Sequence, residues 1–332
     1  MNRVVALSDA LTPWHSFWIR FGQYREELSF PVEITNNIRQ LSTLEKNDTL
    51  FFYRFQPEWG CIVQRLKKLK SDGIRIITDI DDCVWQAPYG WDRTRQQMFT
   101  KAVQLCDAIT CSTEALQELL IIMFPGKPVH VIRNSAPIIK ERSRDEDNRL
   151  TLCWSGAPWT RPKDLLILQR LAKWIQDNRI NVSWHHIGHA DGRLSFADAV
   201  GIPRLQVRTT KLSGYKEYLN ALTGDIGLAP VADGAFNSFK SEIKLVEYSA
   251  AGMTWIGSNT NAYKEMCARW GINGNLCGEP EEWIKRLEQL LIQDDLEYEK
   301  SQMRKFAHQY QNRNTTIAQW ERIIEGCWEP LS

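Results

Sequence analysis

Short, almost continuously apolar runs alternate along the chain with segments whose apolar residues recur at helical spacing. A run that is apolar at nearly every position is typical of a strand buried on both faces of a parallel sheet, whereas apolar residues three and four apart predict an amphipathic helix. The alternation runs through the chain twice, so we predict an α/β fold with two doubly wound Rossmann-like domains facing each other across a cleft. The expected strands are 2–8, 49–55, 74–78, 107–113, 129–132, 150–154, 182–187, 205–210, 226–231 and 253–257, and the expected helices are 17–28, 59–70, 98–105, 114–123, 164–176, 215–222, 241–252, 262–270, 280–293, 296–310 and 315–327.

A charged run lies between the two halves of this pattern. Residues 140–149 read Lys-Glu-Arg-Ser-Arg-Asp-Glu-Asp-Asn-Arg, and these side chains cannot be buried cheaply. We therefore predict an interdomain linker here, with domains at 1–145 and 146–310 and a helical, aromatic-rich C-terminal segment at 311–332.

The stretch from Ser241 to Gly252 is the helix around which we expect the site to be built. It lies between the strands 226–231 and 253–257, so that strand, helix and strand form one parallel crossover unit. Ile243, Val246 and Ala250 recur at helical spacing. Ser241 is suited to be the N-cap, and Gly252 stands where a C-cap glycine belongs.

Polar residues at the start of this helix indicate an anionic ligand. Lys244 and Glu247 are three residues apart and share a face, and Lys240 stands just outside the N-cap. A helix N-terminus attracts phosphate because its first N–H groups are free and its dipole is positive there. Two lysines and a carboxylate would clamp a nucleoside diphosphate, with the carboxylate on the ribose hydroxyls. The alternative is an ordinary amphipathic helix with one Lys–Glu pair.

The same segment resembles the donor-binding helix of glycosyltransferases with the GT-B fold. Ser-Glu-Ile-Lys-Leu-Val-Glu-Tyr-Ser-Ala-Ala-Gly is similar to Ser-Pro-x-Lys-x-x-Glu-Tyr-x-Ala-x-Gly, found in many bacterial, family-4-like polysaccharide and O-antigen glycosyltransferases. The resemblance implies that Glu247 holds the nucleotide ribose and that Lys244 contacts the diphosphate. It also implies a last helix that crosses back and packs on the first domain, with Trp320 and Trp328 as anchors.

A second phosphate-binding element is expected where the second domain begins. The strand 150–154 runs into a Ser155-Gly156 turn, and Arg161 and Lys163 follow in the next loop. A turn of small residues lets the backbone approach a phosphate, and two cations beside it would neutralise the charge. In the enzymes that the chain resembles, an arginine or lysine grips phosphate at this turn.

The chain departs from the family pattern in two places. The arginine that often follows the turn glycine is absent, and Phe239 stands where many family-4 enzymes carry a second glutamate. Asp233, on a longer loop, is the expected substitute in contacting the sugar. These departures leave room for a second hypothesis, a non-catalytic nucleotide- or carbohydrate-binding protein with the same fold. A sugar-phosphate epimerase of this fold is disfavoured, because its characteristic acid–base residues are not identifiable.

Three carboxylates follow the strand 74–78. Asp79, Asp81 and Asp82 would repel one another at the carboxyl edge of a sheet, so they indicate a metal, a hydroxyl-rich ligand or a base; the alternative is that one of them caps the next segment. His15 lies in the loop after the first strand, at the edge where ligands of doubly wound sheets collect.

The string Asp-Ile-Asp-Asp-Cys-Val-Trp also resembles one in a subset of the same glycosyltransferases, which implies the acceptor half of the cleft. If the enzyme inverts configuration, Asp79, Asp81, Asp82 or His15 could be its base. If it retains configuration, which the helix motif favours, the family precedent is same-face attack without an obligatory base.

Composition narrows the classes of partner. There are 41 basic and 40 acidic residues, and the net charge of +1 does not suggest nucleic acid. Eight scattered cysteines without a Cys-x-x-Cys pair fit buried free thiols in a reducing cytoplasm. The histidines within 185–189 lack a further ligand at zinc spacing. We expect no metal and no cofactor besides the nucleotide-sugar co-substrate.

Membrane signals are limited. No apolar run is long enough to span a bilayer, and the first residues do not read as a signal peptide. The basic helix end 66–70 could touch anionic lipid, although a solvated helix end is the simpler explanation. The expected location is the cytoplasm, with a peripheral contact to the inner face of the membrane left open.

These features predict a metal-independent glycosyltransferase that moves a sugar from a nucleotide-sugar donor to a saccharide or lipid-linked acceptor. The expected donor-binding residues are Glu247, Lys244, Lys240, Ser241, Arg161, Lys163, Gly156 and Asp233.

Overall fold

Two six-stranded parallel sheets form the framework of the protein. The structure, a computed structural model, describes residues 3–8, 16–54, 60–87, 91–139, 149–188, 194–211, 214–310 and 312–327, without the side chains of residues 293, 294 and 310. The chain divides into two compact units, one comprising Met1–Asn134, Phe239–Ser241 and Arg313–Ser332, the other Ser135–Ser238 and Glu242–Asn312. The prediction of two doubly wound α/β domains is confirmed. The expected boundary between residues 145 and 146 lies outside the described residues.

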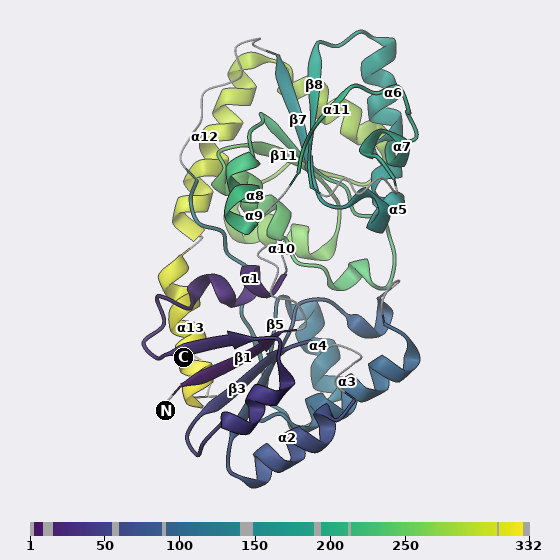
Figure 1. Ribbon diagram of the computed structural model, residues 1–332. Coiled ribbons are helices and arrows are strands. Elements are labelled where there is room, and N and C mark those ends of the chain that lie inside the picture. Colours follow the sequence, from purple (N-terminus) through teal and green to yellow (C-terminus); the bar gives the residue numbers. More distant parts are fainter. Residues whose placement is uncertain are drawn as a thin grey trace. The chain divides into compact units, whose positions relative to one another are not determined.

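The first unit is built on a sheet whose four central strands are buried along almost their whole length. The strand order in the sheet is β2-β1-β3-β4-β5-β6 (Figure 1), so the order reverses between β1 and β3. The strands are β1 (Val4–Ser8), β2 (Val32–Thr35), β3 (Thr49–Tyr53), β4 (Arg75–Ile80), β5 (Ala108–Cys111) and β6 (Val129–Val131).

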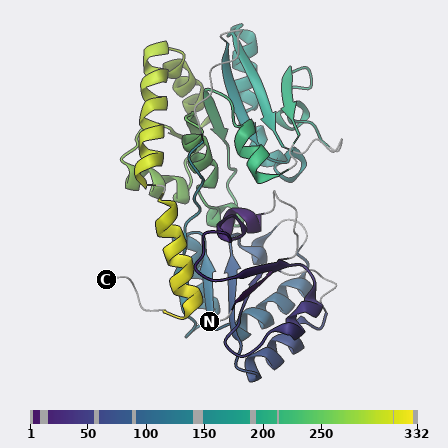
Figure 2. The ribbon, with the colours of Figure 1, turned by 60° about the vertical axis from the view of Figure 1, so that its left-hand side comes forward.

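Helices cover both faces of this sheet. Successive residues of a strand point to opposite faces of the sheet: Phe52 packs among the helices on one side, and Phe51 packs on the other. The first side is covered by α2 (Ile62–Ser71), α3 (Arg93–Leu105) and α4 (Glu114–Met123), and the second by α1 (Ser16–Arg20) and α13 (Arg313–Glu325) (Figures 1 and 2).

The last described helix, α13, belongs to the first unit. Trp320 is fully buried, with its ring edge-on to Phe21 and Phe51 at centroid distances of 5.1 and 5.4 Å. Aromatic pairs of this geometry stabilise packing beyond the area that they bury. The return of the chain to the first domain, with Trp320 as an anchor, is confirmed; Trp328, the second predicted anchor, lies outside the described residues.

The second unit repeats the architecture with another strand order, β12-β11-β10-β7-β8-β9. The order reverses between β7 and β10, so the connections on the two sides of this point lead in opposite directions. The strands are β7 (Leu150–Ser155), β8 (Val182–Ile187), β9 (Val207–Thr210), β10 (Ile226–Ala229), β11 (Thr254–Ser258) and β12 (Leu276–Cys277).

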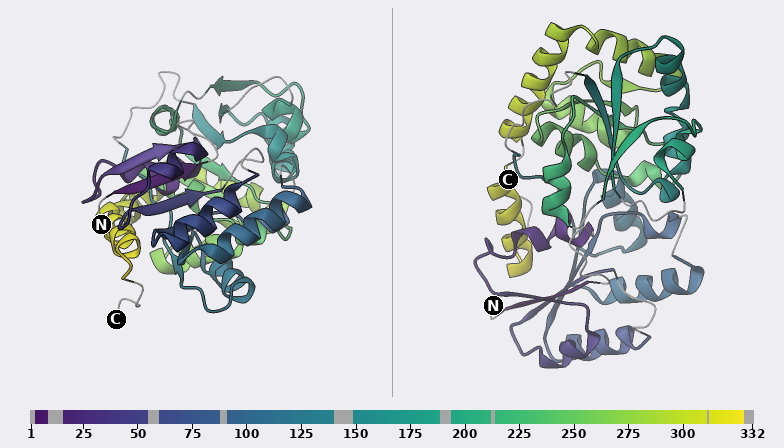
Figure 3. Two further views of the ribbon diagram at one scale, coloured as in Figure 1. Left: turned by 60° about the horizontal axis from the view of Figure 1, so that its bottom comes forward. Right: turned by 45° about the horizontal axis from the view of Figure 1, so that its top comes forward.

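Helices also flank both faces of the second sheet (Figure 3). One face packs on Leu165, Leu171, Phe196 and Trp283, which come from four helices. On the other face α9 packs against β10, β11 and α12. The helices are α5 (Pro162–Leu166), α6 (Gln169–Asp177), α7 (Phe196–Val200), α8 (Tyr215–Ala221), α9 (Ile243–Ala250), α10 (Asn261–Trp270), α11 (Pro280–Leu290) and α12 (Gln293–Tyr310).

Candidate nucleotide site

The point where the second sheet reverses brings the central helix to the carboxyl edge of β7. In open α/β sheets, ligands bind outside the carboxyl ends of the strands at such a reversal. β7 ends at Ser155 and its neighbour β10 ends at Ala229, and the chain from β10 leads into α9. At the far end of α9, Gly252 has a φ of +75° and follows the C-cap Ala251, as the sequence predicts.

Lys244 reaches from the first turn of α9 to the end of β7. Its Nζ donates to the carbonyl oxygen of Ser155 and, at 3.0 Å, to Ser155 Oγ, and it lies 5.3 Å from the ring centroid of Trp154. Burial lowers the pKa of Lys244 to about 8, aided by repulsion from Arg161 and opposed by the charge of Glu247. The ammonium is therefore held in place before any ligand arrives.

Glu247 lies one turn further along the same face, and its side chain is buried. Tyr218 donates to Oε2 at 2.5 Å and Tyr215 donates to Oε1 at 3.1 Å. Burial raises the pKa of Glu247 to about 7, although both tyrosine hydroxyls and Lys244 act to lower it. A carboxylate held in this way can accept hydrogen bonds from ribose hydroxyls once it is ionised.

Gly156 forms the tight turn after β7 that the sequence predicts. Its φ is +143°, and a Cβ at this position would lie 3.0 Å from the Trp154 ring. Its N–H donates to the carbonyl of Ile187 at 2.9 Å, and its carbonyl lies 3.0 Å from His186 Nε2. The turn thus needs glycine for its backbone conformation, while the amide of Gly156 itself is used within the protein.

The remaining predicted donor-binding residues of this unit are Arg161, Lys163 and Asp233, and they do not all interact with Lys244. Arg161 forms an ion pair with Asp164 at 3.4 Å and is near enough to Lys244 to lower its pKa. Lys163 and Asp233 are exposed and form no hydrogen bond or ion pair with this group in the part of the chain that the structure describes. Arg161 therefore joins Lys244, Glu247 and Gly156.

Two predicted donor residues lie in the first unit instead. The N-cap of α9 is Glu242, without a side-chain capping bond, so the prediction that Ser241 caps the helix is wrong. Ser241 Oγ accepts a hydrogen bond from Asn134 at 2.7 Å, which commits its oxygen elsewhere. Lys240 Nζ lies 3.4 Å from Asp82 Oδ1.

Asp79 is a structural residue, which corrects the prediction that it could act as a base. It has no exposed surface, and Arg20 donates to its two oxygens at 2.9 and 2.7 Å. Thr110 donates to Oδ1 at 2.6 Å. A carboxylate whose oxygens are filled by buried donors cannot reach an acceptor hydroxyl.

Asp81 and Asp82 are more accessible and share a cation. Arg54 Nη2 lies 2.7 Å from Asp81 and 3.4 Å from Asp82. Burial acts to raise the pKa of Asp81, but Arg54 and Tyr53 outweigh it and lower the pKa to about 2. With Lys240 they form a group of two cations and two carboxylates at the carboxyl edge of the first sheet. His15, the fourth predicted base, lies outside the described residues.

The tyrosines of α8 are the functional residues that sequence reasoning missed. Tyr215 and Tyr218 are three residues apart, so both hydroxyls reach the same carboxylate from one face of a helix. The spacing of the two tyrosines can be read from the sequence, but Glu247 is distant from them along the chain, so the sequence does not show that they contact it.

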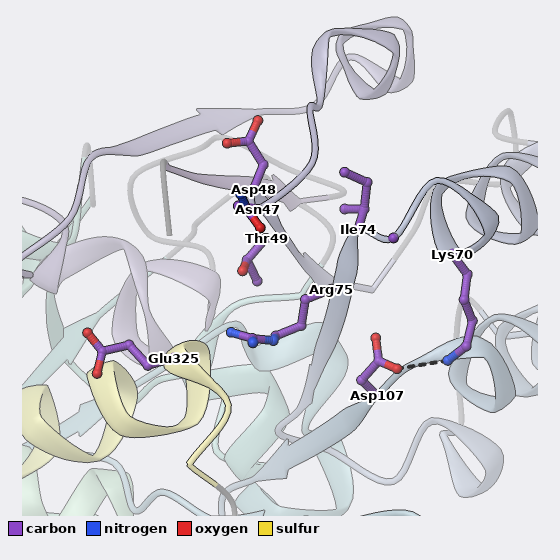
Figure 4. A pocket seen from close by; sticks show the side chains of 9 residues that line it. Asn47, Asp48, Thr49, Lys70, Ile74, Arg75, Asp107 and Glu325 are labelled. Carbon is purple, nitrogen blue, oxygen red and sulfur yellow. Dashed lines mark hydrogen bonds and ion pairs between the residues drawn. The ribbon is translucent and has the colours of Figure 1, made fainter.

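A pocket of the first unit lies at the edge of its sheet where the strands begin, opposite the carboxyl edge that carries Asp81 and Asp82. It has a volume of about 580 Å³. Three of its charged residues are paired within the unit: Lys70 with Asp107 at 2.8 Å, and Arg75 with the carbonyl of Ile324, to which it donates at 2.6 Å. None of the predicted site residues lines it. The lining residues are Asn47, Asp48, Thr49, Lys70, Gly73, Ile74, Arg75, Asp107 and Glu325 (Figure 4).

Among the described helices, none is both long enough and apolar enough to cross a membrane. All eight cysteines are free, and six of them are buried; Cys61 and Cys327 are exposed.

The chain is similar to known proteins in its structure. No protein-family model and no curated protein matches the sequence. An S. aureus TarM variant in complex with fondaparinux, α-GlcNAc-glycerol and UDP matches with a TM-score of 0.62 at 12% identity, over 85% of this chain and 56% of that chain. This chain thus spans little more than half the length of TarM.

Two trehalose-phosphate synthases match along their whole length. A UDP-forming α,α-trehalose-phosphate synthase from Burkholderia xenovorans, in complex with glucose-6-phosphate, gives a TM-score of 0.65 at 11% identity, over 98% of this chain and 100% of that chain. OtsA in its apo form gives 0.63 at 10% identity, over 100% of both chains. At these identities the likeness is one of fold. The chain has the GT-B fold of these glycosyltransferases, as the resemblance of residues 241–252 implies.

Proposed function

We propose that the protein is a nucleotide-sugar-dependent glycosyltransferase whose donor binds at the carboxyl edge of β7. One observation carries the proposal: Lys244 and Glu247 converge, in a buried hydrogen-bonded group, at the point where the second sheet reverses. A cation and a carboxylate about one helical turn apart match the diphosphate and ribose of one nucleotide. The GT-B fold supports the same assignment.

In the proposed reaction the acceptor oxygen forms a bond to the anomeric carbon while the bond from that carbon to the β-phosphate oxygen breaks. Lys244 and Arg161 stabilise the negative charge that develops on the leaving diphosphate, as preorganised cations do, so no metal is required for that role. The acceptor proton passes to the leaving phosphate oxygen if configuration is retained, which the helix motif favours. UDP is the first nucleotide to test, because the TarM variant is in complex with UDP and the Burkholderia enzyme is UDP-forming.

We assign the acceptor to the group formed by Arg54, Asp81, Asp82 and Lys240. Paired carboxylates and cations suit a saccharide, whose hydroxyls both donate and accept hydrogen bonds. If the reaction inverts configuration, we propose Asp82 as the base. Asp81 is less suited to that role, because Arg54 and Tyr53 lower its pKa to about 2 and make it a weak base.

A panel of nucleotide sugars tests the proposal. Incubation of the protein with UDP-, GDP- and ADP-sugars, with and without saccharide acceptors, is expected to release free nucleotide from one of them. Phe239 favours the second candidate, a non-catalytic binding protein, because it packs against the hydrophobic core of the first unit where many family-4 enzymes carry a glutamate. Nucleotide-sugar binding without release would establish that candidate instead.

Nucleotide affinity is expected to depend on pH with a narrow maximum. Glu247 must lose its proton to accept from the ribose, and its pKa is raised to about 7; Lys244 must keep its proton, and its pKa is lowered to about 8. Affinity should fall about tenfold for each pH unit below 7 and again above 8. Calorimetric titration with UDP across this range measures it; affinity that is constant from pH 6 to pH 9 would contradict the assignment.

We also propose a peripheral membrane contact through the edge of the first unit at which α2 and α4 end. Both helices run against the strands, so their last turns lie at one edge of the first sheet. Ile121 and Ile122 are 51% and 78% exposed in the last turn of α4, and Lys67 and Lys68 are exposed on α2. Basic and exposed apolar side chains at one edge of a sheet suit an anionic bilayer.

Co-sedimentation separates this contact from a solvated helix end. The protein is expected to sediment with vesicles that contain phosphatidylserine and to remain in solution with phosphatidylcholine alone. Replacement of Ile121 and Ile122 by glutamate should abolish the sedimentation. Equal behaviour with both kinds of vesicle would count against the contact.

A further inference from the structure

Two side chains, Ser155 and Tyr218, join Lys244 to Glu247 in one hydrogen-bonded path. Lys244 Nζ lies 3.0 Å from Ser155 Oγ, Ser155 Oγ lies 3.1 Å from the hydroxyl of Tyr218, and that hydroxyl lies 2.5 Å from Glu247 Oε2. Ser155, Tyr218 and Glu247 are all buried. The two charged residues of the proposed donor site are thus connected inside the protein through Ser155 and Tyr218, which the mechanism above does not use.

The number of protons fixes the direction of this path. A phenol has one hydrogen, and the short contact to a carboxylate is the stronger of its two bonds. Tyr218 therefore donates its hydrogen to Glu247, and its hydroxyl oxygen lies 3.1 Å from Ser155 Oγ, which in turn accepts from Lys244. Tyr248 fits the same scheme, because its hydroxyl donates to the carbonyl of Leu228 at 3.2 Å and accepts from the backbone N–H of Ser155 at 3.3 Å.

We infer that Tyr218 is a positioning residue for the donor nucleotide: its hydroxyl fixes the carboxylate of Glu247 relative to Ser155 and Lys244, so that ribose and diphosphate are recognised together. The inference rests on the proposed function. Tyr215 provides the comparison, because it donates to the other carboxylate oxygen, Oε1, at 3.1 Å. A Tyr215→Phe variant loses one hydrogen bond to Glu247 but keeps the connection to Ser155 and Lys244.

The hydroxyl of Tyr218 also favours the charged form of Glu247. It acts to lower the pKa of Glu247 against the effect of burial, which raises that pKa to about 7. Without the hydroxyl, the carboxylate would lose a donor in a buried setting and would hold its proton to a higher pH. A purely structural tyrosine would change stability without moving the pH at which nucleotide binds.

The experiment is a calorimetric titration of the full chain with UDP from pH 5.5 to pH 8.5, for the wild type, Tyr218→Phe and Tyr215→Phe. Tyr218→Phe is expected to weaken UDP binding about tenfold or more at neutral pH and to move the lower pH midpoint upward. Tyr215→Phe should have the smaller effect on both. Inorganic pyrophosphate, which lacks the ribose, should lose less affinity than UDP in Tyr218→Phe.

Ser155→Ala gives a second route to the same answer, because it removes the other end of the Tyr218 bond and should shift the pH midpoint in the same direction. UDP binding by Tyr218→Phe and Ser155→Ala with wild-type affinity and pH dependence would overturn the inference alone. A wild-type protein that binds none of UDP, GDP and ADP would overturn the proposed function together with it, so the two failures are distinguishable.

Discussion

Glu247→Ala and Lys244→Ala are each expected to reduce nucleotide release from the donor sugar by at least about 100-fold while the protein stays folded. Lys244 is the buried cation aimed at the leaving diphosphate, and removing one preorganised group of this kind costs about two to three orders of magnitude in turnover. Glu247 is the group proposed to hold the ribose. Initial rates of nucleotide release at saturating acceptor measure both effects.

Matched controls come from the surface of the same unit. Lys173 on α6 and Glu288 on α11 are exposed, so Lys173→Ala and Glu288→Ala remove the same charges from solvated positions and should leave the rate within about twofold. Unchanged turnover in the Glu247 and Lys244 variants, with intact folding by circular dichroism, would remove the site assignment.

Asp79→Asn is expected to lower the free energy of unfolding of the first unit by about 3–5 kcal/mol, because it leaves the buried guanidinium of Arg20 without its counter-charge. The pair is bidentate, and the side chains of Arg20 and Asp79 are 1% and 0% exposed. Urea denaturation followed by tryptophan fluorescence measures the loss.

The exposed pair of Lys68 and Asp72, at 2.8 Å on α2, is the control for this variant. Asp72→Asn should cost less than about 1 kcal/mol, as exposed ion pairs do. An Asp79→Asn variant as stable as Asp72→Asn would show that the buried pair is not needed for folding, and Asp79 would again be available for chemistry.

The sequence predicts the sheets well where burial makes a strand apolar at every position. The runs 49–55, 74–78 and 150–154 correspond to β3, β4 and β7. The strands without a prediction are edge strands: β2 reads Val-Glu-Ile-Thr and is only partly buried, and β12 is two residues long. Edge strands carry fewer buried residues and therefore a weaker pattern.

Helix boundaries are less predictable because they depend on local geometry. The expected helix 17–28 ends as α1 at Arg20, and a 3₁₀ turn, Gly22–Tyr24, follows. Phe21, between them, has a φ of −135°, outside the helical range. The expected helix 164–176 is likewise divided into α5 and α6. Apolar spacing continues across both interruptions, so periodicity alone joins the pieces.

The candidate site is also only partly predictable: some of its residues follow from local spacing, whereas their partners are distant in the sequence. Lys244 and Glu247 follow from spacing within one helix. The partners that hold them do not, since Tyr218 is 29 residues from Glu247 and Ser155 is 89 residues from Lys244 in the sequence. The role of Asp79 depends on Arg20, 59 residues away. In the second unit, the strand order, which brings β7 beside β10, places Ser155 near Lys244.

A crystal structure of the protein with UDP tests the central claim most directly. We predict the diphosphate within hydrogen-bonding distance of Lys244 Nζ and the ribose hydroxyls on the carboxylate of Glu247, at the carboxyl edge of β7. The account would be contradicted by UDP that is bound elsewhere and makes no contact with Lys244 or Glu247. One such place is the pocket of the first unit that is lined by Lys70, Arg75 and Asp107, where the strands of the first sheet begin.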